Sequence, residues 1–299
     1  MIHYRELVKK MYLLLLSLLL IQSPELSASD KKPNIFVTVK PQAGIIKSIA
    51  GNLVDTTVLI TGSCPDTFSP TAKQIKNLSD ADIYFTLALP FEKIWIKKTS
   101  LTKDKIKPMG KGIKLKNVES LKEHHHDGID KDYKHHIHGS KDPHIWVSLK
   151  NSLKMADNTY EILVELMPEH KKEFKKNLEE YKKKISSLDL ELKKRFTAQK
   201  DKNIFVFHPV FAYLAYDYGL KQIVIQVEGK DPTAKQLTKI IDMIKDKKAK
   251  VIFTQPEFSD RTARAVAKQT NTKIIPISIY NEDISLTVKD LIDKWETNE

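Results

Sequence analysis

Seven of the ten histidines in this chain lie between residues 123 and 146, in the stretch EHHHDGIDKDYKHHIHGSKDPHIW. Neutral imidazole is a good ligand for Zn²⁺ and similar transition metals, so this density of histidines predicts metal binding. The first six sit among aspartates and glycines without apolar periodicity, which predicts a loop over residues 123–139. Such a loop binds zinc weakly, because it loses conformational freedom when it closes on the ion. A polar spacer without metal function is the alternative interpretation.

Two further histidines are placed for a more organised site. His144 follows Asp142 and Pro143 at an expected helix start, and His208 follows an apolar run, residues 203–207, that predicts a buried strand. In open α/β sheets, ligands bind beyond the carboxyl ends of the strands. We therefore expect His144 and His208 to share one site, although each alone is compatible with a structural role. Because protonated imidazole cannot bind metal, affinity should fall below a pH of about 6.5.

Short apolar runs that alternate with amphipathic segments must position these histidines. The runs NIFVTV, TTVLITG and DIYFTLA predict strands of a first α/β lobe, and NIFVFH, QIVIQV, VIFTQP and KIIPISI predict strands of a second. In the segment SPTAKQIKNLSD, Ser69 and Pro70 predict the cap and first position of a helix. The alternation predicts mainly parallel sheets in both lobes.

One long helix is expected between the lobes. From Phe174 to Phe196, apolar residues recur every three or four positions, and almost all the others are charged. A helix over 169–198 would be roughly 45 Å long. We therefore predict an α/β fold with two lobes joined by one rigid helix, and a metal site in the cleft between the lobes. A helical hairpin for self-association is the alternative.

Charge and the N-terminus restrict the partners and the compartment. The 50 Lys and Arg exceed the 38 Asp and Glu by 12, but glutamates separate the lysines and stacking aromatics are scarce, so we expect no nucleic-acid partner.

Lys9 and Lys10 precede a short apolar run and then small residues, which predicts a cleaved signal peptide and export to the periplasm; a retained anchor is the alternative. The predicted parts are a signal peptide at 1–28, a first lobe at 29–168, a linking helix at 169–198 and a second lobe at 199–299.

These motifs together resemble the metal-specific solute-binding proteins of ABC transporters. The resemblance rests on DPHIWVSLKN, the long charged helix, VFHPVFAYLAYDYGL and EGKDPTAKQLTKIIDMIKDKKAKVIFTQPEFS, and it extends over nearly the whole mature chain. It implies two α/β lobes, a histidine-rich loop typical of zinc members, and capture of a divalent metal for a permease in the inner membrane, without catalysis. We accordingly expect a monomeric periplasmic protein that binds Zn²⁺, with Mn²⁺ or Fe²⁺ as alternative cargo.

The resemblance also implies a set of ligands. His144 and His208 match ligand positions of the family, and Asp66, in GSCPDTFSP, stands where the family usually has a histidine. A carboxylate can bind Zn²⁺, although oxygen ligands shift the preference toward Mn²⁺. The family's fourth ligand, an acid, aligns near Ser278, which is a poor metal ligand. The candidates for the fourth position are Cys64, Glu282, Asp283, a histidine of the loop and water.

Two other functional classes fit parts of the sequence. A secreted zinc hydrolase would keep His144 and His208 beside a catalytic water, but the sequence holds neither an HExxH motif nor a phosphate-binding glycine loop. An adhesin or a zinc-buffering protein without a permease would use the same ligands. Only a measurement of metal uptake separates that class from transport.

Overall fold

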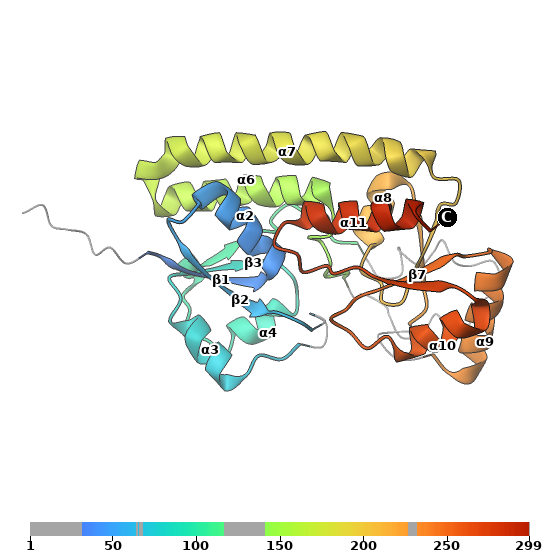
Figure 1. Cartoon of the computed structure of the whole chain (residues 1–299). Coiled ribbons are helices and arrows are strands. Elements are labelled where there is room, and N and C mark those ends of the chain that lie inside the picture. The colour runs from blue at the N-terminus through green and yellow to red at the C-terminus, as the bar shows by residue number, and fades with distance from the viewer. Residues whose placement is uncertain (1–31, 64, 66–67, 117–140, 227–231, 299) are drawn as a thin grey trace, which may run out of the picture. The chain divides into compact units, whose positions relative to one another are not determined.

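The computed structural model describes residues 32–63, 65, 68–116, 141–226 and 232–298, whose strands form two parallel sheets of four strands each. The first sheet has the order β2-β1-β3-β4, and the second has the equivalent order β6-β5-β7-β8 (Figure 1). Because all neighbouring strands are parallel, the carboxyl ends of the four strands lie along one edge of each sheet. The strands are β1 Asn34–Val39, β2 Asp55–Ile60, β3 Ile83–Thr86, β4 Ile106–Pro108, β5 Asn203–Val206, β6 Lys221–Val224, β7 Val251–Thr254 and β8 Lys273–Pro276.

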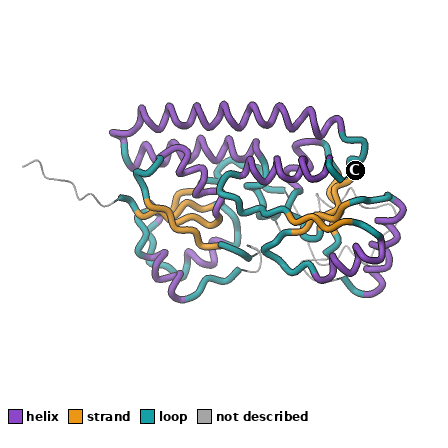
Figure 2. Tube along the Cα trace, in the orientation of Figure 1, coloured by secondary structure: helices purple, strands orange, loops and turns teal. Residues whose placement is uncertain are grey.

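Helices connect the strands and flank both sheets (Figure 2). Strands β3 and β7 are buried along their whole length, as expected for parallel strands that are covered on both faces. The prediction of two α/β lobes with mainly parallel sheets is therefore confirmed. The helices are α2 Lys40–Ala50, α3 Ala72–Ser79, α4 Glu92–Ile96, α6 Leu149–Leu166, α7 Lys171–Ala198, α8 Ala212–Tyr218, α9 Ala234–Asp246, α10 Arg261–Thr270 and α11 Ile284–Glu296, with the 3-10 helices η1 Lys103–Lys105 and η4 Pro168–His170.

The predicted long helix is α7, which follows η4 and extends over both lobes (Figure 1). Its 28 residues give a length of about 42 Å. It packs against α2 and α6 of the first lobe and against α8 and α11 beside the second sheet. The predicted apolar stripe is the packed face, although Leu188 within it is only partly buried. Its buried members are Phe174, Leu178, Tyr181, Ile185, Leu192 and Phe196.

One hydrophobic core continues beneath α7 from lobe to lobe. It joins Phe85 of β3 and Phe253 of β7 to Phe196 of α7. A smaller core fills the space between the second sheet and helices α9 and α10. The chain from Pro33 onward therefore forms one compact unit although it contains two sheets. A shared core of this kind restricts motion of one lobe against the other.

Equivalent helices of the two lobes start with the same pentapeptide. PTAKQ occurs at residues 70–74 and 232–236, in each lobe between the second and the third strand. In both copies the threonine side chain accepts a hydrogen bond from the glutamine backbone, and the glutamine side chain accepts one from the threonine backbone. This capping box starts α3 at Ala72 with Thr71 as its cap. The prediction that Ser69 is the cap is wrong, because the reciprocal pair is the stronger helix start.

Several predicted features lie outside the described residues: the signal peptide at 1–28, Cys64, Asp66 and the histidine-rich loop at 123–139. Within the described part of the chain, no helix is both long enough and apolar enough to cross a bilayer. The boundaries of the two lobes, at residues 168 and 199, stay predictions.

Candidate metal-binding site

His208 lies just beyond the carboxyl end of β5, a central strand of the second sheet, as predicted. The ladder continues past the assigned strands, since Gln226 donates its backbone N–H to the Phe207 carbonyl at 2.9 Å. Gln226 follows β6, and this bond holds it beside His208. The His208 side chain is buried, with 6% of its surface exposed. On its other side the ring of Phe258, which follows β7, lies 5.0 Å away between centroids.

Hydrogen bonds fix the tautomers of His144 and His208. His208 Nδ1 lies 2.6 Å from Gln226 Oε1, and His144 Nδ1 lies 3.0 Å from Asp142 Oδ1. Amide and carboxylate oxygens only accept, so both Nδ1 atoms carry the proton and both Nε2 atoms carry the lone pair. A histidine whose Nδ1–H donates to an oxygen in this way is typical of zinc sites, where the partner orients the ring and makes it a stronger ligand.

The two histidine rings lie against each other. Their centroids are 5.5 Å apart and their planes are nearly perpendicular, at 84°. His144 is as deeply buried as His208, with 1% of its surface exposed. The structure thus brings together two of the three residues that the sequence assigned to one site, in a place where water is largely excluded.

His208 remains a neutral ligand in acid. Burial, together with the nearby His144 ring, lowers the pKa of His208 from 6.5 to about 4, and the hydrogen bond with Gln226 offsets part of this shift. For His208 alone, proton competition is therefore expected near pH 4 rather than near pH 6.5, and the pH dependence of metal affinity stays a prediction.

His144 does not lie in the first turn of a helix, which corrects the sequence interpretation. Helix α6 begins at Leu149, and Ser148 caps it by accepting a hydrogen bond from Asn151 N at 3.1 Å. Asp142 instead turns back onto the histidine, where its Oδ1 also accepts the His144 backbone N–H at 2.8 Å. Asp142 therefore orients a candidate ligand, a role that its position before a proline did not indicate.

Aromatic side chains connect this pair to the loop that carries Asp66. The Trp146 ring lies 5.3 Å from His144 and stacks on Tyr280 at 6.0 Å. The Tyr280 hydroxyl donates to the Ser63 carbonyl at 2.7 Å. Ser63 follows the carboxyl end of β2 and precedes Asp66 by three residues. Ser63 is thus connected to the histidines through Tyr280 and Trp146, whereas Asp66 is outside the described residues.

At the position of the family's fourth ligand, Ser278 pairs with a carboxylate from the turn after β7. Ser278 Oγ donates to Glu257 Oε1. Glu257 Oε2 and both amide atoms of Gln255 are buried and find no hydrogen-bond partner among the described residues. Gln226, Gln255 and Glu257 were not predicted from the sequence, and the available indication was their position within three residues of the ends of β6 and β7.

Two acids proposed for the fourth position bind elsewhere. Glu282 pairs with Lys47 at 3.3 Å. Asp283 caps α11 and pairs with Lys184 at 2.6 Å. Over the described ranges, no three His, Cys, Asp or Glu side chains come close enough together to hold a metal ion.

A family model matches almost all of the described chain. The model is described as "Zinc-uptake complex component A periplasmic" (ZnuA), and it matches residues 35–296. The zinc-binding protein AdcA of Streptococcus pyogenes serotype M3 is 30% identical over 290 residues, which cover 91% of this chain. The match covers 56% of that relative, so the chain spans little more than half its length.

Solved structures share the fold at similar sequence identity. A crystal structure of ZnuA has a TM-score of 0.79 and 27% identity, and the match covers 90% of this chain and 99% of that one. A ZnuA deletion mutant with zinc bound has a TM-score of 0.77 and 27% identity, with 90% and 98% covered. The agreement extends over both sheets and the long helix.

Proposed function

This chain belongs to the family of zinc-uptake complex component A, and from that premise we propose that it captures a divalent transition metal ion, zinc first, and delivers it to the permease of an ABC importer. The partner is a membrane permease, and the metal is cargo rather than a catalytic cofactor. The proposed place of work is outside the cytoplasmic membrane, and the proposed working form is a monomer.

One observation carries the proposal: two buried histidines face each other with their Nδ1–H groups held by oxygens. Because Asp142 and Gln226 fix these protons, the Nε2 atoms of His144 and His208 are the ligand atoms. Two imidazole ligands favour Zn²⁺ over the harder Mn²⁺. We propose Asp66 as the third ligand, supported by the anchoring of its loop through the bond between Ser63 and Tyr280.

The burial of both histidine rings affects how the metal ion is released. An ion can enter or leave only after neighbouring groups move, because His144 and His208 are almost fully enclosed. The continuous core beneath α7 opposes a wide opening of the lobes. We propose that docking on the permease favours a small rearrangement of the loops around the histidines, and that this state has the lower metal affinity.

The test is a competitive titration with Zn²⁺ and Mn²⁺, in which bound metal is counted. Wild type is compared with His208→Ala, with a deletion of residues 123–139, and with His170→Ala as the matched control. His170 lies near the start of α7, where it pairs with Glu173 at 3.2 Å, far along the chain from the proposed ligands. We expect one tight zinc in wild type, a loss of roughly a hundredfold or more in His208→Ala, and little change in the control.

The deletion separates the two histidine groups. Retention of one tight zinc without residues 123–139 supports the buried pair as the principal site. Loss of all tight binding in that variant, with normal binding by His208→Ala, would instead make the loop the binder and refute the proposed site. A tight preference for Mn²⁺ would keep the site but change its cargo.

A further inference from the structure

A pocket of about 280 Å³ lies at the amino edge of the second sheet, at the opposite end of β5 from His208. Apolar groups from three elements form part of its wall: Phe205 of β5, Phe253 of β7 and Trp295 of α11. The remaining wall comes from the segment before β5 and from the turn between α9 and β7. The site therefore lies away from the histidine pair and uses none of its residues.

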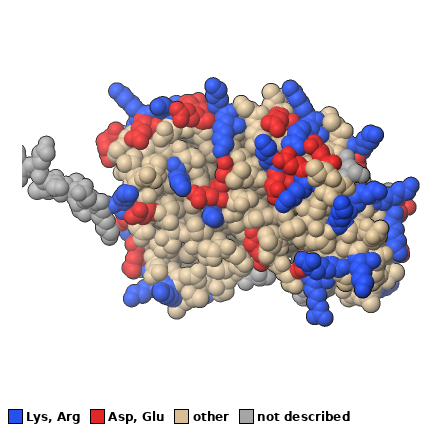
Figure 3. All heavy atoms as spheres, viewed as in Figure 1, with Lys and Arg blue, Asp and Glu red and all other residues tan. Residues whose placement is uncertain are grey.

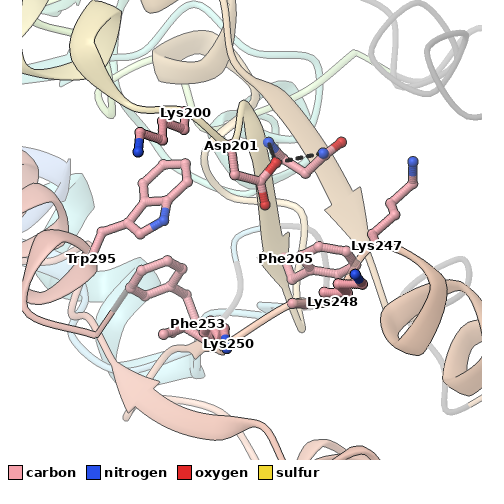
Figure 4. A pocket seen from close by; sticks show the side chains of 11 residues that line it. Lys200, Asp201, Phe205, Lys247, Lys248, Lys250, Phe253 and Trp295 are labelled. Atoms are coloured by element: carbon pink, nitrogen blue, oxygen red, sulfur yellow. Dashed lines mark hydrogen bonds between the residues drawn. The ribbon is translucent and has the colours of Figure 1, made fainter.

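Four lysines surround this pocket: Lys200, Lys247, Lys248 and Lys250. Figure 4 shows Lys200 beside Trp295 on one side, with Lys247 and Lys248 on the other. All four are exposed, and among the described residues none forms an ion pair with a carboxylate. Lys and Arg side chains also gather over the α9 and α10 end of this lobe in Figure 3, with few acids among them.

The only acid among the lining residues is already engaged. Asp201 Oδ1 accepts from the Asn203 backbone N–H at 2.9 Å and from Asn203 Nδ2 at 2.6 Å. These bonds turn the carboxylate toward the start of β5. The acid thus compensates part of the positive charge but does not bind a lysine directly.

Helix ends offer a structural explanation for lysines at this edge, because α7, α9 and α11 all end nearby and a helix carboxyl terminus attracts cations. Other lysines already serve two of these ends. Lys202 donates to the Phe196 and Thr197 carbonyls of α7 at 2.6 and 2.9 Å, and Lys273 donates to Asn298, just past α11, at 2.9 Å. Asp201 offsets one of the four lysine charges and the helix ends offset part of the rest, so the pocket keeps an excess of positive charge.

We propose that this pocket binds a phosphate group, carried either by inorganic phosphate or by the headgroup of an acidic phospholipid. Inorganic phosphate has a charge of about −1.5 to −2 near pH 7, and the phosphodiester of an acidic phospholipid has a single negative charge. Both present more acceptor oxygens to the ammonium donors than a single carboxylate does. Lysine binds phosphate as a point charge and needs no planar geometry. The aromatic wall gives the apolar part of a phosphate ester a surface to contact. This inference does not depend on the proposed metal transport.

The experiment uses the full mature chain and two charge-matched variants. The test variant is Lys200→Gln/Lys247→Gln/Lys250→Gln. Lys248 is left unchanged because its φ of 51° places it in the left-handed region. The control removes the same charge from the exposed face of α7 as Lys171→Gln/Lys172→Gln/Lys183→Gln. Binding of inorganic phosphate is followed by ³¹P NMR, and binding to vesicles of phosphatidylglycerol or phosphatidylcholine by sedimentation, all at fixed ionic strength.

We expect saturable binding of phosphate, of phosphatidylglycerol vesicles, or of both. The affinity should fall roughly tenfold or more in the test variant and less than about twofold in the control, because contacts between charged groups are lost only at the pocket. Binding of phosphate without vesicles identifies the free anion as the source, and the reverse identifies the lipid. The proposal is overturned if neither probe binds, or if both variants lose affinity equally, which would indicate general surface charge.

Discussion

At the carboxyl edge of the first sheet, buried polar groups around Glu92 form hydrogen bonds with one another. Glu92 accepts hydrogen bonds from Thr38, from Tyr84 at 3.3 Å, and from the backbone N–H groups of Leu87 and Leu89, both at 2.9 Å. Burial raises the pKa of Glu92, while these bonds, that from Thr38 first, oppose the shift. The described polar groups around Glu92 therefore form a network with a structural role.

At the carboxyl edge of the second sheet, which we call the open edge, some buried polar atoms have no hydrogen-bond partner among the described residues. The edge around Glu92 is called the closed edge. Gln226 holds His208, but Gln255 and Glu257 keep buried polar atoms without a partner within the described residues. The two sheets have equivalent strand order, so topology does not cause the difference. Buried polar groups in native proteins are normally satisfied, and groups that are not indicate a place for a ligand or water. The comparison thus identifies the second edge as a place where described polar groups are available to a ligand.

The largest expected effect is at the closed edge. Replacement of Glu92 by Ala should lower the free energy of unfolding by roughly 3–4 kcal/mol, because four buried donors lose their acceptor. Urea unfolding of the metal-free protein measures this loss. Zinc affinity of the folded fraction should stay within about threefold of wild type. A variant with normal stability and weak zinc binding would reverse the roles assigned to the two edges.

The next effect is the pH dependence of stability at the open edge. The unfolded chain protonates His208 below about pH 6.5, whereas the folded chain does so only near pH 4. Protons therefore favour the unfolded state in this window, and falling pH should remove roughly 3 kcal/mol of stability in the metal-free protein. Unfolding of His208→Gln at several pH values should show this part of the slope removed. An unchanged slope would contradict the low pKa of His208.

A smaller effect is expected from the partner of His208. Gln226→Leu removes the acceptor that fixes the ring, and zinc affinity should fall by about 10–100-fold. Gln222→Leu is the matched control, because Gln222 accepts the Phe211 N–H at 2.8 Å and lies in the same strand region. That variant should lose stability but keep zinc affinity. Equal losses of affinity would mean that the tautomer of His208 does not matter.

The smallest effect is expected at Gln255, whose side-chain amide has no hydrogen bond to the described residues, in contrast to the amide of Gln42. Gln255→Leu should change stability by less than about 1 kcal/mol, since it removes buried atoms that make no hydrogen bond to the described residues. Gln42→Leu in the first lobe should cost about 2–3 kcal/mol, because Gln42 binds the Thr38 and Val39 N–H groups and the Phe85 carbonyl. Thermal unfolding of the two variants side by side tests the contrast. Similar costs would show that the second edge is as closed as the first.

The sequence predicted the features that depend on local pattern. The strands, the long helix and the position of His208 after a strand follow from apolar periodicity, which acts over a few residues. The pairing of His144 with His208 was also expected from the residues, and the resemblance added Asp66 as a further ligand. The helix cap at Ser69 was wrong because two local signals competed, and the repeated PTAKQ at residues 232–236 contained the information to choose Thr71.

The rest of the site depends on which strand ends become neighbours. Gln226 acts on His208 because β6 lies beside β5, and Ser278 meets Glu257 because β8 lies beside β7. Neither pairing has a sequence spacing that marks it. Asp142 was visible but was interpreted as a helix start, since a carboxylate before a proline fits both roles.

The hydrogen bond between Tyr280 and Ser63 joins residues 217 positions apart. The same late segment accepts the Trp146 indole N–H at the Ile279 carbonyl, across 133 positions. Contacts of this range close large loops and make folding slow. This segment is synthesised after both histidines. A nascent chain that ends before residue 277 therefore holds both histidines but lacks the contacts that connect them to the loop after β2, so the assembled site can form only after residue 280 has been synthesised.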